Sequence, residues 1–223
     1  GLAYNESIEI VNLKQIKLTE ESSFYLLKNL NKMVKLKNLK LENCVFGDYM
    51  PDLCEFLTSN KTIKDVSLVG SLYNIKIKDL HYLSEVIRKN NTIESLNITG
   101  CHFKTNKGSY IELLDAFKIN SSIKNLNLSH CGIGNKIEGL FQLQDMIKEN
   151  KTIEKLDLQG NNLFINLGST MKSDIGILNN KAIKELNLNH NNLGCSEIGF
   201  ECFCKALEEN NTIEVLSMTY NSI

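Results

Sequence analysis

The chain has 223 residues, of which 42% are hydrophobic and 23% are charged, and its formal net charge at pH 7 is −1. This composition is that of an ordinary soluble protein. It excludes the strong positive field that draws a protein onto nucleic acid or acidic lipid. No apolar run approaches the roughly 18 residues that a membrane-crossing helix needs. We therefore expect partners other than nucleic acid or membrane.

Asparagine recurs every thirty residues, at Asn60, Asn90, Asn120, Asn150, Asn180 and Asn210. Three positions after each asparagine stands an isoleucine: Ile63, Ile93, Ile123, Ile153, Ile183 and Ile213. A fixed period of this length is typical of a stack of near-identical units, each of which covers the apolar face of its neighbour. Residues 1–223 are therefore expected to form one repeat domain. Its last unit is incomplete, so we expect the chain to be part of a longer protein.

Each unit should begin with a short strand. Leu156 and Leu158 alternate with Asp157, as in a strand buried on one face. Weaker copies of this pattern start at Leu13 and Leu36, and the count over the chain is eight strands. This alignment makes Lys14 equivalent to Lys37 and Lys17 equivalent to Lys40, so the four lysines are expected to cluster on the first two strands.

A helix should follow each strand, because apolar residues recur at helical spacing, for example at Leu140, Leu143, Met146 and Ile147. Ser196, which precedes Glu197, is a candidate helix N-cap. The thirty-residue asparagines fall where the helices end. Asparagine tolerates the left-handed conformation that often closes a helix, so we predict that conformation at these positions.

The unit from Ile153 to Leu163 fits the pattern L-x-x-L-x-L-x-x-[N/C]-x-L, and five others repeat it in register. This pattern resembles the leucine-rich repeat, and the long helical segment resembles its ribonuclease-inhibitor-like class. The resemblance implies an α/β solenoid shaped like a horseshoe, with a parallel sheet on the concave face and helices on the convex face. It also implies that the residue at the [N/C] position faces inward and bonds adjoining turns. That position holds Asn161, Asn191, Asn221, Cys44, Cys101 and Cys131, whereas Ser71 departs from the pattern and predicts an irregular turn.

Neither the seven cysteines nor the charged residues form a catalytic or cofactor-binding motif. An odd cysteine count without framework spacing favours free thiols in a reducing compartment, and so an intracellular, cytoplasmic protein. The pairs Cys101–His102 and His130–Cys131 suggest zinc ligands, but a zinc site needs about four that converge. We expect no enzyme activity, cofactor or metal.

The exposed strand positions are the candidate contacts for another protein. They are polar, adaptable side chains near the middle and the C-terminal edge of the sheet: Asn127, Asp157, Gln159, Asn187, Asn189, His190 and Tyr220. Lys14, Lys17, Lys37 and Lys40 form a second candidate patch, for an acidic partner. We expect a protein–protein interaction module.

Two other functions stay open on sequence alone. Relatives of this repeat class include GTPase-activating proteins, cytoskeletal cappers such as tropomodulin, and intracellular immune receptors, so the chain could be a regulatory segment of a larger protein. An arginine-finger mechanism finds little support, because Arg88 is the single arginine. The chain could also be a passive spacer.

Overall fold

A computed structural model describes residues 5–46, 49–73, 76–101, 109–164, 176–177 and 179–222. Its strands form one sheet in chain order, and every neighbouring pair is parallel. The strands are β1 (Ile10–Lys14), β2 (Asn38–Glu42), β3 (Asp65–Ser67), β4 (Ser95–Asn97), β5 (Asn125–Asn127), β6 (Lys155–Asp157), β7 (Glu185–Asn187) and β8 (Val215–Ser217). The count of eight strands is therefore confirmed.

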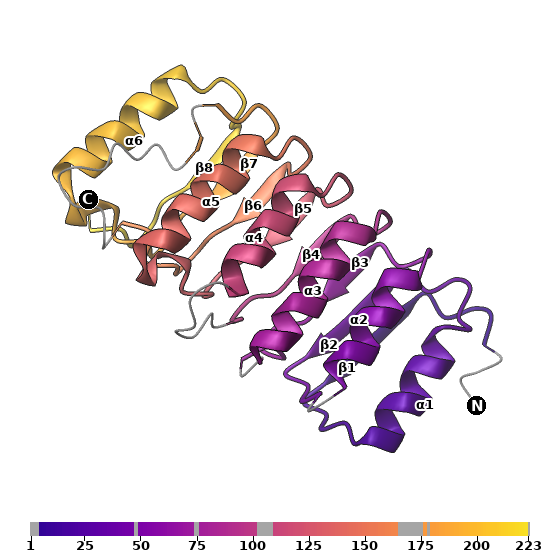
Figure 1. The fold of residues 1–223 in the computed structure, drawn as a ribbon. Coiled ribbons are helices and arrows are strands. Elements are labelled where there is room, and N and C mark those ends of the chain that lie inside the picture. The colour runs from indigo at the N-terminus through magenta and orange to yellow at the C-terminus, as the bar shows by residue number, and fades with distance from the viewer. Residues whose placement is uncertain are drawn as a thin grey trace.

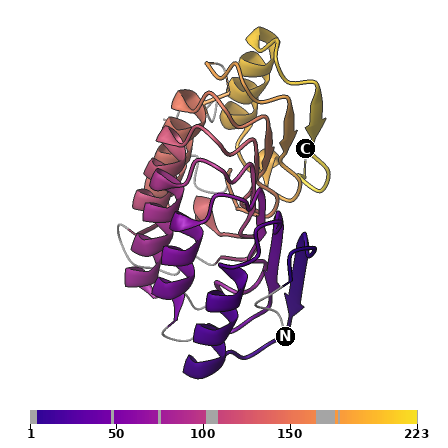
Figure 2. The same ribbon diagram turned by 90° about the vertical axis from the view of Figure 1, so that its right-hand side faces the viewer.

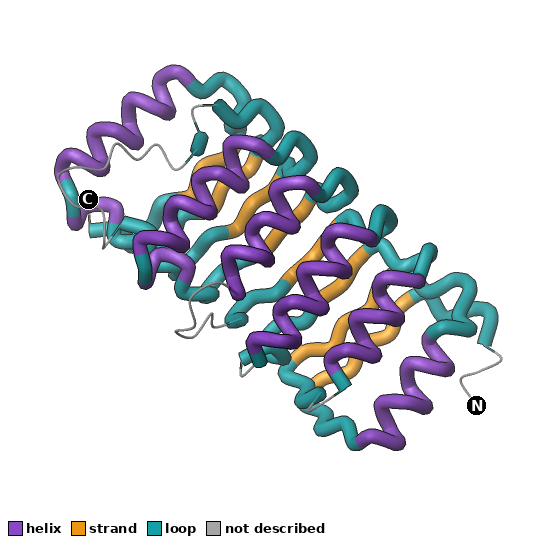
Figure 3. The backbone as a smooth tube through the Cα atoms, viewed as in Figure 1, coloured by secondary structure: helices purple, strands orange, loops and turns teal. Residues whose placement is uncertain are grey.

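The helices cover one face of this sheet and leave the other open (Figures 1 and 2). Within the described residues they are α1 (Glu20–Leu30), α2 (Met50–Ser59), α3 (Ile77–Lys89), α4 (Ser109–Ile119), α5 (Ile137–Glu149) and α6 (Glu197–Glu209). Short 3₁₀ turns, η2 (Ile133–Asn135) and η3 (Leu193–Cys195), precede α5 and α6. Helices line one side of the stack and strands the other (Figure 3). None of these helices is both long and apolar enough to cross a membrane.

The core lies between the sheet and the helices. Ile63, Ile93, Ile123, Ile153 and Ile183 are almost fully buried, and so are the inward-facing aliphatic side chains of the inner strands β2 to β7, as predicted. Ile213 in the last unit is only partly buried, as are Ile8 and Val11 in the first. The end units therefore leave part of their apolar side uncovered, which the stacking of repeats explains.

The asparagines that end the helices do not adopt the predicted left-handed conformation. Asn60 has φ −67° and ψ 138°, and Asn150 has φ −68° and ψ 134°, which is extended backbone. Hydrogen bonds from their side chains take the place of the left-handed turn that we predicted. Asn150 Oδ1 accepts hydrogen bonds from the backbone N–H groups of Thr152 and Ile153, at 2.9 and 2.8 Å. Asn150 Nδ2 donates to the carbonyls of Phe117 and Asn120 in the previous unit, at 2.8 and 3.1 Å.

This double bridge recurs at Asn90, Asn120, Asn180 and Asn210, each of which reaches back to two carbonyls of the preceding unit. The amide side chain satisfies backbone groups of both units, which would otherwise be buried without partners. A column of amides therefore ties the helix ends together, and it explains the strict period better than a helix-terminating conformation does.

The predicted equivalence of the lysines is wrong, because the first strand is set five residues earlier than we expected. Leu13 pairs with Leu41, and Lys14 therefore lies opposite Glu42 rather than Lys37. The true first unit begins at Ile8, and the misplacement arose because Leu13 also fits the start of the pattern.

The four lysines are consequently spread along the two strands. Lys37 forms a salt bridge with Glu9 at 3.2 Å. Lys40 lies opposite Asn12 in the strand register, and the backbone of Lys17 forms a parallel β-bridge with Val45. The pairing therefore gives no support to a single lysine patch, although all four side chains are exposed.

Candidate functional site

The C-terminal edge of the sheet is built on a second column of buried amides. Asn161 Nδ2 donates to the carbonyls of Leu128 and Leu158, at 2.8 and 3.0 Å, and its Oδ1 accepts from the N–H of Cys131. Asn191 and Asn221 repeat this arrangement. The inward-facing role that the repeat pattern implied is thus confirmed at these positions.

Serine and cysteine fill the same column by different means. The Ser71 hydroxyl donates to the Leu41 carbonyl at 2.6 Å and accepts from the Cys44 N–H at 2.8 Å, so one oxygen makes both bonds. The irregular turn predicted at Ser71 does not arise at this position, because the hydroxyl reproduces the asparagine bonds. Cys131 Sγ reaches the Ile98 carbonyl at 3.5 Å.

Directly before this column, every unit places one residue in the left-handed region. The φ values lie between 51° and 73° for Gln15, Asn43, Gly70, Gly100, His130, Gly160, His190 and Tyr220. Sequence reasoning missed this feature, although glycine at three of the eight positions was a usable signal. The turn directs the His190 and Tyr220 side chains to the exposed rim of the sheet.

Two rim side chains occupy space that a neighbouring glycine leaves free. A Cβ atom built on Gly160 would collide with the His130 ring, and one built on Gly70 would collide with the Asn43 amide. His190 and Tyr220 instead stack, with ring centroids 4.5 Å apart and planes inclined by 6°. The Tyr220 side chain is 78% exposed, which makes it a large aromatic surface at the end of the rim.

The polar residues in the middle of the sheet hold one another in place. Asn127 Nδ2 donates to Asp157 Oδ2 at 3.0 Å, and Asp157 Oδ1 accepts from the Gln159 N–H at 3.0 Å. Asn187 Oδ1 accepts from the Asn189 N–H in the same way, and Asn187 Nδ2 approaches Gln159 Oε1 at 3.4 Å. The structure therefore joins these five predicted contact residues in one network and leaves each half-buried.

A shallow hollow of about 320 Å³ lies over the inner face of β4 to β8. Its lining includes three of the predicted contact residues, Asn127, Asp157 and Asn187. It also includes residues that were not among the predicted contacts: Asn97, Asn125, Lys155, Glu185, Val215 and Ser217. The hollow is shallow and crosses five units, which suits an extended surface better than a small molecule.

Opposite charges alternate along the N-terminal side of the sheet. Glu94 lies between Lys64, at 2.8 Å, and Lys124, at 3.2 Å, and Glu154 pairs with Lys184 at 3.0 Å. Hydrogen bonds from Lys64 and Lys124 lower the pKa of Glu94, and the bond from Lys184 lowers that of Glu154. These exposed pairs neutralise one another, so this side of the sheet carries no single-sign field.

The cysteines show no features of a reactive or metal-binding site. All seven are free. Burial raises the pKa of Cys54 and of Cys131 to about 12, which keeps both thiols neutral. Within the described ranges, no three His, Cys, Asp or Glu side chains converge as metal ligands would. His102, one half of the suggested zinc pair, lies outside the described residues.

Arg88 is also occupied within the fold. Its guanidinium donates to the Glu112 carbonyl at 3.3 Å and lies 3.7 Å from Glu85, on the helical side of the molecule. An arginine finger must reach out to a bound nucleotide. Arg88 would have to break these contacts to do so.

Comparisons with known proteins give one family match and a set of similar solved structures. The family described as "Leucine Rich repeat" matches residues 120–137. No curated protein matches the chain. Sixty chains of solved structures are similar to it. One is "Leiomodin-1 Actin-Binding Site 2 (ABS2)", which is 18% identical, with a TM-score of 0.48, over 61% of this chain and 77% of that one. The repeated unit and the single open parallel sheet, with helices on one face, give this chain the fold of a leucine-rich-repeat α/β solenoid.

Proposed function

We propose that this chain binds another protein through the inner face of its sheet, as a repeat module of the ribonuclease-inhibitor-like class. The observation that carries the proposal is the network from Asn127 to Asn189, next to the stacked His190–Tyr220 pair. Side chains that are already held in place lose little conformational entropy on binding, which favours a higher affinity. The proposed contacts are Asn127, Asp157, Gln159, Asn187, Asn189, His190 and Tyr220.

Tyr220 is the strongest single candidate among these contacts. Tyrosine is enriched among the few residues that supply most of the energy of an interface. Its side chain is more exposed than any other large hydrophobic side chain for which exposure is described. Stacking on His190 fixes the ring without covering it. We therefore expect Tyr220 and His190 to act as one aromatic contact.

The proposal includes a reducing, intracellular setting. Cys195 is exposed and free, and Cys202 and Cys204 are partly exposed and free. Exposed thiols of this kind persist where glutathione keeps them reduced. This support comes from the thiols alone and does not identify a particular compartment.

The test removes the aromatic contact without disturbing the turn. In the variant His190→Gly/Tyr220→Gly, both residues change to the one that three other units already use in the left-handed position. The wild type and the variant are used to capture proteins from an extract of the source cells, and quantitative mass spectrometry measures the enrichment. For proteins that the wild type binds, we expect the variant to reduce the enrichment by more than about tenfold.

Gln15→Gly/Asn43→Gly is the matched control, because it makes the same change at the same turn position in the first two units. It should capture the same proteins as the wild type. Full capture by the His190/Tyr220 variant would contradict the placement of the contact. If the wild type itself enriched no protein, the chain would act as a passive spacer.

A further inference from the structure

The first helix is not attached to its neighbour as the later helices are. In later units, the asparagine at the helix end donates to two carbonyls of the previous unit, as Asn90 does to Leu57 and Asn60. In the first unit, Met33 occupies the place of that asparagine. Among the described contacts, the Asn60 side chain accepts hydrogen bonds only from Thr62 and Ile63 of its own unit. The amide bridge is thus absent between α1 and α2 in the described part of the chain.

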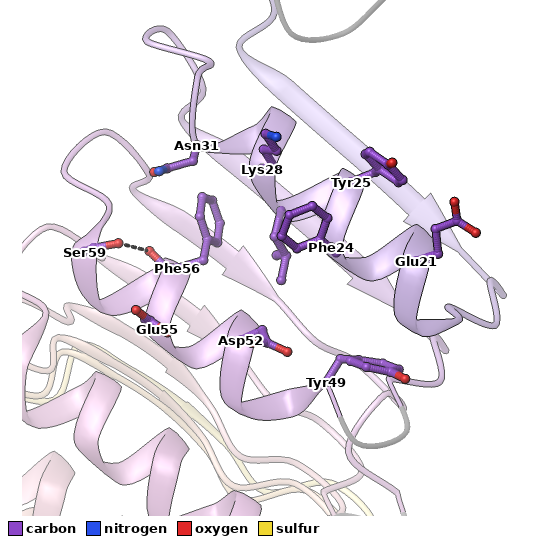
Figure 4. A pocket seen from close by; sticks show the side chains of 11 residues that line it. Glu21, Phe24, Tyr25, Lys28, Asn31, Tyr49, Asp52, Glu55, Phe56 and Ser59 are labelled. Carbon is purple, nitrogen blue, oxygen red and sulfur yellow. Dashed lines mark hydrogen bonds between the residues drawn. The ribbon is translucent and has the colours of Figure 1, made fainter.

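A groove of about 660 Å³ lies at this junction. It runs between α1 and α2, from Tyr49 at one end to Asn31 and Ser59 at the other (Figure 4). The ten residues of α2 correspond to a length of about 15 Å. The groove is therefore long enough to hold about three turns of a helix.

The groove has an apolar floor with an exposed aromatic above it. Phe56 is 6% exposed and Leu27 is partly buried, whereas the Phe24 ring is 59% exposed. Phe24 lies on α1 where that helix faces α2 (Figure 4). An apolar surface of this kind, left open between two helices, suits the apolar face of a third helix.

The charges around the groove are mainly negative. Glu21, Asp52 and Glu55 line it, and Lys28 is its one cationic lining residue. Three carboxylates against one ammonium give a net charge of −2. Lys28 Nζ lies over the Phe24 ring, 5.5 Å from its centroid. None of the three carboxylates forms a salt bridge with another described residue, in contrast to the paired glutamates of the sheet.

We propose that the α1–α2 groove binds a basic, amphipathic helix of a partner protein. The apolar side chains of that helix would cover Phe24, Leu27 and Phe56, and its lysine or arginine side chains would meet the three carboxylates. This site lies on the helical layer and is separate from the inner sheet face, so the two binding activities stand or fall independently.

The probe is a constrained helical peptide of about 12 residues, with leucine at positions i, i+3, i+4 and i+7 and lysine elsewhere. A constraint is needed because isolated helices of this length are marginal in water. The same peptide with glutamate in place of lysine is the control for charge. Fluorescence anisotropy measures affinity, and NMR chemical shifts locate the contact.

We expect saturable binding of the lysine peptide, weakening as salt is added, with shifts in α1 and α2. Glu21→Gln/Asp52→Asn/Glu55→Gln should weaken it by about tenfold or more. Phe24→Ser should weaken it as well, since it removes apolar area from the groove. Phe24 is mostly exposed, so neither variant should unfold the chain, and thermal denaturation checks this.

The helix α5 offers a matched surface away from the α1–α2 groove. It carries the exposed ring of Phe141 and the carboxylates of Glu138, Asp145 and Glu149. Phe141→Ser and Glu138→Gln/Asp145→Asn/Glu149→Gln should leave peptide binding unchanged. Equal weakening by the α5 variants would overturn the proposal, because bulk charge would then explain binding. Equal binding of the glutamate peptide, or no saturable binding of either peptide, would overturn it too.

Discussion

Two columns of this stack, the asparagine at Asn60 and its repeats and the isoleucine three residues later, keep their residue from unit to unit, whereas the columns on the open face of the sheet change at almost every step. Asparagine recurs at the same position in six successive units, and isoleucine stands three residues after it each time. The middle column of the inner face instead reads Ser67, Asn97, Asn127, Asp157, Asn187 and Ser217. The difference separates two tasks: the constant columns join the units, and the variable columns give the surface its chemistry.

The largest effect should come from the constant apolar column. Ile153→Ala removes a side chain that is 2% exposed, and we expect a loss of about 2–5 kcal/mol because a cavity is left between the sheet and the helices. Chemical denaturation measures the change. A midpoint that hardly moves would show that the isoleucine column does not join the units.

The second-largest loss of stability should come from the asparagine column that includes Asn60 and Asn150. Asn150→Ala breaks bonds to Thr152, Ile153, Phe117 and Asn120, and we expect a loss of about 2–4 kcal/mol. Asn60→Ala should cost about half of this, since Asn60 makes only the bonds within its own unit. Equal losses in the two variants would remove the distinction between the bridged helices and α1.

A smaller loss of stability should appear at the left-handed positions on the rim of the sheet. The backbone conformation there is the same in every unit, but the side chain differs. Gly160→Ala places a Cβ against the His130 ring at φ +66°, and we expect it to cost about 1–3 kcal/mol. In a His130→Gly background the ring is gone, and the same change should cost only about 1 kcal/mol. A double-mutant cycle by thermal denaturation measures the coupling. Zero coupling would mean that the ring does not occupy the space above Gly160.

The smallest effect concerns the charged column. The lysine bond lowers the folded-state pKa of Glu154, so its contribution to stability is present above the unfolded pKa and is lost as pH falls through the folded pKa. The side chain is exposed, and we expect only a slight acid dependence. An NMR titration should find the Glu154 pKa below its ordinary value and should find it raised in Lys184→Met. An unchanged pKa in that variant would show that the pair does not form in solution.

The sequence predicted the constant columns well, because burial and period leave few alternatives. The strands, the buried isoleucines, the inward amides of Asn161 and Asn191 and the N-cap at Ser196, which accepts from Gly199 N–H at 3.1 Å, follow from local pattern. The first strand was set wrongly because Ile8 and Leu13 both fit the start of a unit.

The chemistry of the variable columns was harder to predict. At the left-handed residues His130 and His190 the backbone N–H donates to the neighbouring unit, to the Gln159 and Thr219 carbonyls, and histidine alone does not indicate this conformation. The bond between Asn127 and Asp157 joins residues thirty apart, so it depends on the register of the stack. The α1–α2 groove lies at the junction where the amide bridge is missing, and only the folded chain reveals it.

Photo-crosslinking from the inner sheet face tests the central claim most directly. Asn125 is exposed on β5 and lines the hollow, so Asn125→p-benzoylphenylalanine places a reactive group there without removing a described hydrogen bond. The same replacement at Phe141 samples the helical layer. We predict that irradiation in the source cells joins a partner protein to position 125 and not to position 141. Cross-links from position 141 alone, or equal cross-links from both, would contradict recognition through the sheet.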